Sequence, residues 1–397
     1  EPMLSRKVMV QSNLLIGLPN MLTVTVASEV GIPPESRITV QGLTGVANQS
    51  ESFEVESSPP AIKKIAYFYN SQWAGTVPGK VVMYVSSLGL IAHEEYRISF
   101  AVSNSLQPQP APEISICVHI ESGDYDSVIP CQPMDKTDGY LMGVNHGENP
   151  LNILRPLLSH TQVEQTCPLT HASNLMTIRI KVNMPFEPAS VIRLVGLTGI
   201  ARVIGVQVSD VFEPPNFLST ATTHYLEIRV KNESKLLPQQ QYEVTIDLDN
   251  SGEEQQSPVV YTEGMAQVEF PSAAIGQTMT FALPSLVFTQ IYHWSTFGVI
   301  GGMEPLYLVE PVFTLLGPFY QTNPINQLST RLDLLLQVNV HLLQGSYITF
   351  AGFYQIKPDT TATIAVSCKT SVAFDTAATW NAERSSFRIQ MITSLQD

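Results

Sequence analysis

Apolar and polar residues alternate along the chain, and the same pattern returns at three places. Residues 22–45, 176–199 and 332–353 align without a gap, at spacings of 154 and 156 residues. Each segment opens with apolar residues at every second position, which is typical of a strand with one buried face. A turn containing Pro, Gly or Ser and a second strand follow. We therefore predict three copies of one β-rich unit.

The alignment pairs residues of the same type across the three segments. Ile38, Ile192 and Ile348 correspond in the second strand of each copy, and so do Ser36, Ser190 and Ser346 just before it. In the first two copies this strand ends in Gly-Leu-Thr-Gly, at 42–45 and 196–199. No Lys and no helical pattern follow these glycines, so we interpret them as a tight turn with positive φ rather than a phosphate-binding loop.

A second shared element is a strand that begins with tyrosine. Residues 96–105 (YRISFAVSNS) and 242–251 (YEVTIDLDNS) alternate strictly after Tyr96 and Tyr242. A tyrosine at the start of a late strand resembles the tyrosine corner of immunoglobulin-like sandwiches, where the hydroxyl binds a nearby backbone group. The Cys…Trp…Cys pattern of antibody domains is absent. The resemblance implies an all-β fold of tandem Ig-like β-sandwich repeats in the broad sense.

A third shared element marks the borders of the units. Residues 143–156 and 298–311 share Gly-Val, a later Gly, Pro-Leu and a final Pro. We predict Ig-like units at 1–148 and 149–303, and a partial third unit at 304–397 that lacks its final strands.

The end of the third unit carries the predicted assembly site. Residues 387–391 match 81–85 and 226–230, after which the earlier units continue with the Tyr-led strand and a further strand. If the chain is complete at Asp397, the third sandwich is open. The predicted edge residues are Phe387, Ile389 and Met391.

An open sandwich exposes a strand edge and apolar surface, which proteins normally cover. We expect a strand from a neighbouring copy to fill the gap, an arrangement that resembles donor-strand complementation in pilins. Such a contact is head to tail and builds a filament. The candidate donor residues are Val8, Val10, Leu14 and Ile16. Two alternatives stay open: these residues form the first unit's own opening strand, or the chain is a piece of a longer array.

Composition narrows the class of partner. Hydrophobic residues make up 44% and charged residues 14% of the chain, and the formal net charge is −14. This charge argues against non-specific binding to nucleic acids, which requires a basic surface. The most apolar stretch, residues 276–320, is interrupted by proline and by Gly301-Gly302. We therefore expect no membrane-spanning helix.

The sequence offers no catalytic motif. The eight histidines are dispersed, and H-E-x-x-H, G-x-S-x-G and P-loop patterns are absent. Residues 247–254 begin like a calcium loop, but Pro258 stands where the bidentate glutamate belongs. We expect a non-enzymatic protein with no cofactor and no metal.

Two features bear on the compartment. The four cysteines are either buried free thiols or include one disulfide among Cys117, Cys131 and Cys167, which would leave Cys368 free or pairing between chains. N-glycosylation sequons occur at Asn48 and Asn232. With a lysine-poor surface rich in Ser and Thr, they favour a secreted glycoprotein carrying N-linked glycans.

The repeated strand and turn of the form ITV-x-GLTG is similar to that of tandem-repeat surface and fibre proteins of protists and algae. The resemblance implies an extracellular, structural protein. The first hypothesis is therefore a subunit of an extracellular filament or surface appendage, a homopolymer of identical copies joined head to tail. The alternative is a cell-surface adhesin or carbohydrate-binding repeat protein.

Overall fold

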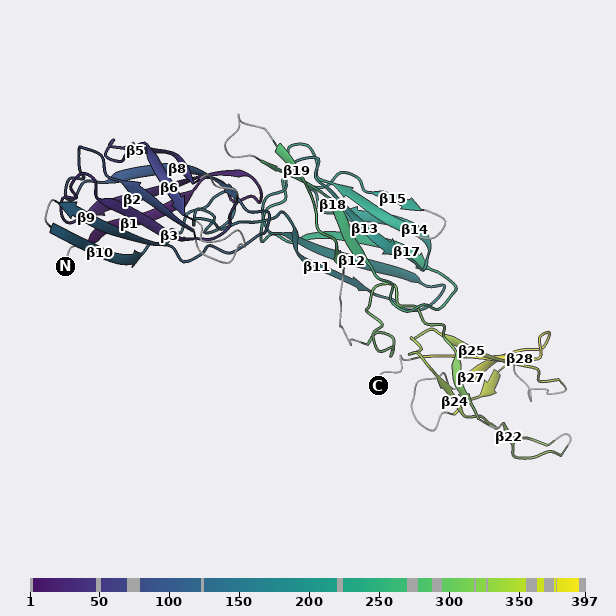
Figure 1. The fold of residues 1–397 in the computed structure, drawn as a ribbon. Helices are drawn as coiled ribbons and strands as arrows, with labels where there is room; N and C mark the ends of the chain where they lie inside the picture. Colours follow the sequence, from purple (N-terminus) through teal and green to yellow (C-terminus); the bar gives the residue numbers. More distant parts are fainter. Residues whose placement is uncertain are drawn as a thin grey trace.

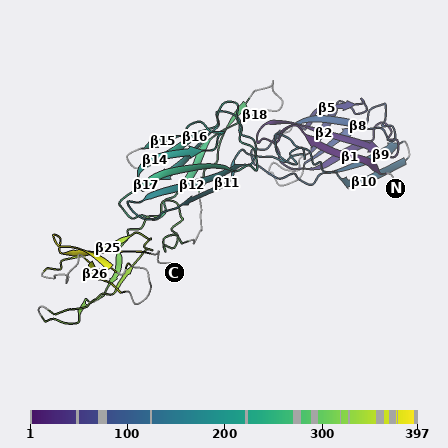
Figure 2. The same ribbon diagram turned by 180° about the vertical axis from the view of Figure 1, so that it is seen from behind.

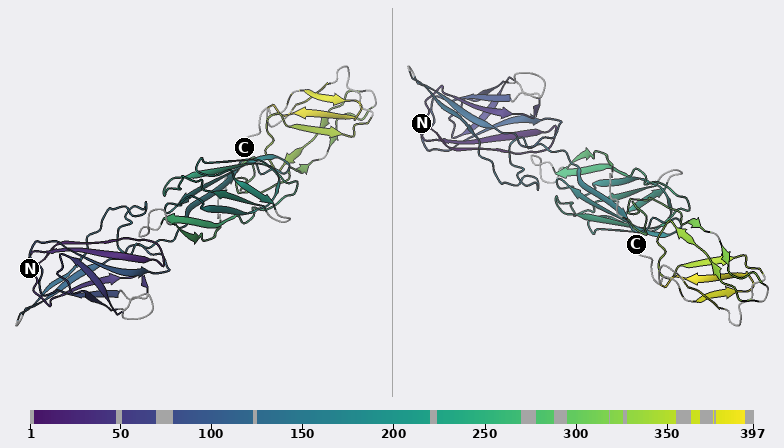
Figure 3. Two further views of the ribbon diagram at one scale, coloured as in Figure 1. Left: turned by 90° about the horizontal axis from the view of Figure 1, so that it is seen from above. Right: turned by 90° about the horizontal axis from the view of Figure 1, so that it is seen from below.

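Two β-sandwich units and a smaller third β-sheet unit follow one another end to end in the computed structural model (Figure 1). The views from behind, above and below show the same row of units (Figures 2 and 3). The structure describes residues 3–47, 51–69, 79–122, 125–219, 224–269, 278–287, 295–317, 319–325, 328–354, 363–367, 375 and 377–392. These residues form strands and connecting segments without a helix. Accordingly, no helix is long and apolar enough to cross a membrane among them. The predicted all-β fold of tandem Ig-like sandwiches is confirmed.

The described residues of the first unit form ten strands. They are β1 (Leu4–Gln11), β2 (Pro19–Ser28), β3 (Arg37–Leu43), β4 (Val46–Ala47), β5 (Ser52–Ser58), β6 (Ile65–Tyr69), β7 (Gly79–Tyr84), β8 (Tyr96–Asn104), β9 (Ser115–Ser122) and β10 (Tyr125–Pro133). Their order is β1-β2-β8-β5-β6-β7-β3-β9-β10, and β4 also pairs with β8. β5 pairs with β6 through its first residues and with β8 through its last ones, so it passes from one layer of the sandwich to the other.

The second unit repeats this plan with two separate sheets. Its strands are β11 (Leu158–Gln165), β12 (Ser173–Val182), β13 (Val191–Leu197), β14 (Ile200–Val208), β15 (Asn216–Ser219), β16 (His224–Arg229), β17 (Tyr242–Asn250), β18 (Tyr261–Glu269), β19 (Thr278–Ala282) and β20 (Leu286–Val287). One sheet has the order β11-β12-β17-β14 and the other β15-β16-β13-β18-β19, with β20 beside β18.

The core of each unit follows directly from the alternation along its strands. In β12, every second residue from Asn174 to Val182 is buried, and β2 has the same pattern. The aligned isoleucines Ile38 and Ile192 are 0% and 1% exposed and lie in β3 and β13. Burial of these inward faces supplies most of the stabilisation of such a sandwich, at about 25 cal/mol per Å² of apolar surface.

The two Tyr-led strands form the predicted tyrosine corners. The Tyr96 hydroxyl accepts a hydrogen bond from the Ile91 amide at 2.9 Å, and the Tyr242 hydroxyl accepts one from the Leu237 amide at 2.6 Å. Both rings are buried, and the Tyr242 ring packs edge-on against Phe212. Each corner ties the loop before a central strand to that strand. The tyrosine-corner prediction is confirmed.

Tyr242 makes the stability of the second unit sensitive to alkaline pH. Burial raises the pKa of Tyr242 above its ordinary value. In the unfolded chain the phenol ionises first as pH rises, so the stability that this group provides is complete below about pH 10 and is lost above it. We expect Tyr242→Phe to lose about 1–2 kcal/mol at pH 7, because the Leu237 amide loses its acceptor. The variant should also lose less stability than the wild type between pH 9 and pH 11.

Urea denaturation at several pH values measures both effects, with Tyr140→Phe as the control because Tyr140 is 70% exposed. An equal alkaline loss of stability in Tyr242→Phe and the wild type would contradict the role of the corner.

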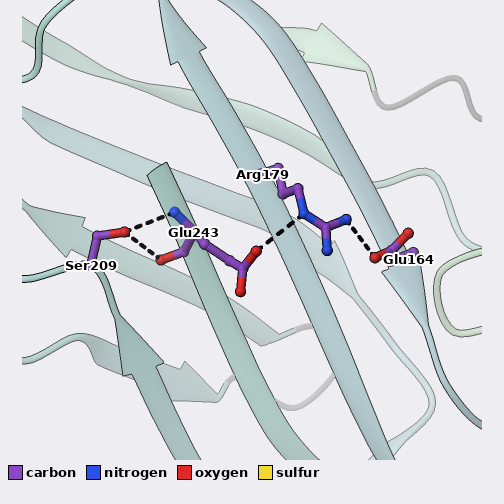
Figure 4. A network of polar contacts seen from close by, with 4 residues as sticks. All are labelled: Glu164, Arg179, Ser209 and Glu243. Carbon is purple, nitrogen blue, oxygen red and sulfur yellow. Dashed lines mark hydrogen bonds and ion pairs between the residues drawn. The ribbon is translucent and has the colours of Figure 1, made fainter. Parts of the chain in front are cut away.

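The outer face of β11, β12 and β17 is held by ion pairs (Figure 4). Arg179 of β12 pairs with Glu164 of β11 on one side, and its Nε lies 3.1 Å from Glu243 of β17 on the other. The hydrogen bond to Glu164 raises the pKa of Arg179. The Ser209 hydroxyl accepts a hydrogen bond from the backbone N–H of Glu243 and donates one to the backbone carbonyl of the same residue. This polar outer face explains why buried and exposed residues alternate so regularly along β12.

The third unit contains β21 (Phe313–Leu316), β22 (Tyr320–Gln321), β23 (Leu332–Asp333), β24 (Leu336–Val338), β25 (Tyr347–Ala351), β26 (Thr363–Ala365), β27 (Ala377–Asn381) and β28 (Ser386–Gln390). Its largest sheet has the order β25-β28-β27-β26. Met391 donates its amide to the Ser346 carbonyl, as Val85 does to Ser36 and Val230 to Ser190. The third segment therefore folds in the register that the alignment predicts.

The position of the open edge differs from the sequence-based prediction. Phe387 pairs with Phe350 of β25 on one side and with Trp380 of β27 on the other. Ile389 pairs with Ile348, and Met391 is buried. These three residues thus belong to a central strand and its end. The sequence shows only where a strand stops along the chain, whereas the edge depends on which strands lie beside it.

The structure decides between a disulfide and a free thiol for three of the four cysteines. Cys117 of β9 and Cys131 of β10 form a disulfide across their hairpin. Cys167 is a buried free thiol, and burial raises its pKa. The remaining cysteine, Cys368, lies outside the described residues.

Candidate functional site: the junctions between repeats

A cluster of buried amide side chains joins the first unit to the second. Gln11, at the end of β1, donates its Nε2 to the carbonyls of Gly147 (2.8 Å) and Asn152 (3.0 Å). Its Oε1 accepts the Leu151 amide at 2.9 Å and the Asn20 side chain at 2.9 Å. Gln11 is 5% exposed. One side chain thus satisfies three backbone groups of the segment that leads into the second unit.

Two asparagines complete this cluster. The Nδ2 of Asn20 bridges the Oδ1 of Asn104 at 3.0 Å and the Oε1 of Gln11. Asn104, at the end of the Tyr-led strand, donates to the carbonyls of Asn13 and Leu15. Both asparagines are 1% exposed. Because the amides satisfy one another, these bonds favour one geometry of the cluster.

The junction between the second and third units repeats the cluster atom for atom. Gln165 donates to the carbonyls of Gly302 (3.0 Å) and Tyr307 (2.9 Å), and it accepts the Leu306 amide at 2.9 Å. Asn174 bridges Gln165 and Asn250, each at 3.0 Å. We call each set, Gln11-Asn20-Asn104 and Gln165-Asn174-Asn250, a junction cluster.

A second glutamine reinforces each junction. Gln109 donates its Nε2 to the carbonyls of Thr44 and Leu151, both at 3.0 Å, and its backbone pairs with Ile153. Gln255 repeats these contacts with Thr198 (3.1 Å) and Leu306 (2.7 Å). A Cβ atom at Gly45 would lie 2.5 Å from the Nε2 of Gln109. The last glycine of Gly-Leu-Thr-Gly is therefore required both by its φ of 75° and by this close approach.

The connecting segment also contacts the unit that follows it. Leu141 and Val144 bond to each other across a turn in which Gly143 has a φ of 71° and faces Pro185 of the second unit. In the next connection, Thr296 and Val299 make the same turn, and Gly298 faces His341. A hollow of about 350 Å³ remains beneath the first turn. It is lined by Leu141, Met142, Gly143, Pro185, Glu187, Lys235, Leu237, Val268 and Glu269. Each connection is thus anchored at both ends.

The third unit carries part of a third junction cluster. Gln321, at the end of β22, stands at the position of Gln11 and Gln165. The Thr330 hydroxyl accepts the Asn323 amide at 3.2 Å, as the Asn20 side chain accepts that of Asn13. The Gln321 side chain is exposed, and its Nε2 donates to the Asn323 carbonyl. In the described part of this unit, no strand supplies a counterpart of Asn104 or Asn250.

The predicted donor residues lie in the first unit and its junction. Val8 and Val10 are in β1, which pairs with β2 of the same sandwich in the register Val8–Thr25 and Val10–Thr23. Leu14 is 0% exposed and belongs to the apolar cluster that continues into the second unit's core. Its carbonyl and the Ile16 amide both bond to Leu154. The segment is thus the first unit's own opening strand, which is the first of the two alternatives left open by the sequence.

The remaining predicted site residues are placed as follows. Asn232 is exposed in the turn after β16, within reach of a modifying enzyme, whereas Asn48 lies outside the described residues. In the part of the chain that the structure describes, no three His, Cys, Asp or Glu side chains gather in a way that could hold a metal ion. Asp249, in the stretch that begins like a calcium loop, instead pairs with Arg202 at 2.8 Å.

Sequence reasoning missed the junction clusters. Their signal was present, because Gln11 and Asn20 recur 154 residues later as Gln165 and Asn174. Only the pairing of β1, β2 and β8 shows that these amides face one another.

Comparisons with known proteins give structural likenesses only. No protein-family profile and no curated protein match the sequence. The C-terminal domain of the Streptococcus pyogenes antigen I/II-family protein AspA is similar, with 8% identity and a TM-score of 0.34, over 71% of this chain and 98% of that one.

Two further structures are similar in the same way. The 35 kDa C-terminal fragment of the major pilin of Streptococcus agalactiae has 8% identity and a TM-score of 0.21, over 71% of this chain and 91% of that one. The collagen adhesin of S. aureus has 7% identity and a TM-score of 0.19, over 72% and 93%. These three proteins are bacterial, and the protist or algal type inferred from the sequence stays a prediction. The fold and the junctions themselves define a tandem Ig-like β-sandwich protein with anchored connections between its units.

Proposed function

We propose that this chain is an extracellular structural protein, the subunit of a filament or surface appendage. The observation that carries the proposal is the repeated junction cluster, which anchors each connection to the units on both sides. Anchored junctions suit a protein that must project or transmit force, because they limit bending between units. The proposal assigns the chain no catalytic role, and it includes an N-linked glycan at Asn232.

We further propose that copies join head to tail at the third unit. β3 pairs with β7 and β9, and β13 pairs with β16 and β18. The equivalent strand, β25, pairs with β28, and among the described residues no strand lies on its other side. Large apolar side chains are exposed in this unit, among them Leu316 (65%), Leu335 (60%) and Tyr347 (57%). A strand from a neighbouring copy, added at β25, would pair with its free edge and cover apolar surface beside it, such as Tyr347.

A lysine on β25 tests this contact. We expect the wild-type chain to form linear oligomers as its concentration rises, and Thr349→Lys to shift the onset to concentrations at least about tenfold higher, because a charge on an edge strand opposes pairing. The control is Thr379→Lys, which places the same charge on β27, a strand paired on both sides. Analytical ultracentrifugation and negative-stain imaging measure the assembly. Wild-type protein that stays monomeric at high concentration would refute head-to-tail joining.

A further inference from the structure

The outer face of β6 and β7 in the first unit carries exposed aromatic rings. Ala66 and Phe68 of β6 point into the core, so Ile65, Tyr67 and Tyr69 point outward. Tyr67 and Tyr69 are 41% and 49% exposed. They lie two residues apart on one strand, about 7 Å, and therefore present two rings along a line.

Lysines and a third tyrosine extend this surface. Tyr84, at the end of β7, packs edge-on against Tyr67 at a centroid distance of 6.1 Å. The ammonium groups of Lys80 and Lys63 lie over the Tyr69 and Tyr84 rings, at 5.4 Å and 5.8 Å from their centroids. We call these five residues the tyrosine-lysine face. Each ammonium is held beside a ring before any ligand arrives.

The same positions in the second unit show that the sandwich does not require these rings. There, Asn216 and Leu218 take the places of Tyr67 and Tyr69, since they pair with Glu227 and Tyr225 as the tyrosines pair with Val82 and Lys80. Arg229 takes the place of Tyr84.

Charges on that second face are paired internally. Glu227 lies 2.7 Å from Arg193 and 3.6 Å from Arg229, and Arg229 also lies 3.8 Å from Glu213. One face of the repeated framework thus satisfies itself with ion pairs. The other presents aromatic rings and the Lys80 ammonium to solvent, while its Lys63 is paired with Glu35 at 2.5 Å. The fold therefore does not account for the exposed tyrosines.

We propose that the tyrosine-lysine face binds an acidic polysaccharide. The C–H face of a sugar ring can lie flat on a tyrosine, while its carboxylates or sulfates pair with the ammonium group of Lys80. β6 is bonded to β5 and β7 on its two edges, so a peptide cannot bind there by strand addition. On a chain with a net charge of −14, Lys80 provides the positive charge that attracts an anion to this face. This inference stands apart from head-to-tail assembly.

Binding of the full chain to polygalacturonate and to dextran sulfate, measured by affinity electrophoresis, tests the proposal. We expect both polymers to bind and neutral dextran not to bind, with binding weakened by salt. Tyr69→Ser and Lys80→Gln should each weaken binding about fivefold or more, because each removes one stacking or charged contact. Leu218→Ser, at the position of Tyr69 in the second unit, is the matched control and should leave binding unchanged.

Three results would overturn the proposal. The first is equal retention on the neutral and acidic polymers. The second is equal binding of poly-glutamate, which would indicate a general anion site. The third is a Tyr69→Ser variant that binds as the wild type does while Lys80→Gln does not, since rings would then play no part. Circular dichroism checks that each variant is folded. Both side chains are exposed, so neither substitution should disturb the core.

Discussion

Replacing Gln11 by alanine is expected to lower the free energy of unfolding by about 3 kcal/mol and to uncouple the first two units. The Gln11 amide donates to two backbone carbonyls and accepts the Leu151 amide and the Asn20 side chain. Alanine removes all four bonds at a position that is 5% exposed, and buried groups that lose their partners are costly. Calorimetry should show two separate unfolding transitions for these units in the variant, and one coupled unfolding transition in the wild type.

Small-angle scattering provides the second measurement, because a loosened junction broadens the distribution of distances between the units. Gln107→Ala is the matched control, since Gln107 stands two residues before the junction glutamine Gln109 and its own side chain is exposed. An unchanged melting profile in Gln11→Ala would mean that the junction cluster does not hold the units together. Gln165→Ala should have the same effect at the second junction.

The second large effect is expected from Leu14→Ala, which should cost about 3 kcal/mol in urea denaturation. Leu14 is 0% exposed and packs in the apolar cluster that runs from the junction into the second unit. Shortening it leaves a cavity that the surrounding strands cannot fill. The control is Leu106→Ala, because Leu106 is 69% exposed and its loss should cost less than about 0.5 kcal/mol.

Leu14→Ala also separates the two roles considered for the N-terminal segment. If residues 8–16 serve only inside their own chain, the variant loses stability at every protein concentration alike. If Leu14 instead inserts into a neighbouring copy, the loss appears only at concentrations where copies associate. Denaturation at low and high protein concentration distinguishes these outcomes.

Much of the fold could be predicted because it depends on patterns within single strands. The alternation in residues 22–45 and 176–199 predicts strands that the structure contains, and Tyr96 and Tyr242 predict corners whose hydrogen bonds are present. Such features need only one strand and the loop before it. A strand with one buried face produces the alternation, and a hydroxyl that binds the preceding loop produces the tyrosine corner. Both causes are local, so each can be recognised in a single stretch of sequence.

The open edge and the junction clusters could not be predicted in this way. Phe387 was assigned to an edge because little sequence follows it, yet β28 lies between β25 and β27. Gln11, Asn20 and Asn104 are separated by up to 93 residues and meet only because β1, β2 and β8 are neighbours. Which strands are adjacent is a property of the folded sheet.

The sequence by itself thus determined the class of fold and the residues that face the cores of the first two units, since buried and exposed residues alternate along each strand. Tertiary structure alone decided where the chain anchors one unit to the next, which of its strands lies at an edge, and that three tyrosines and two lysines share one outer face. These properties arise from contacts between distant strands, and hydrogen bonds and ring contacts become visible only when those strands are in register.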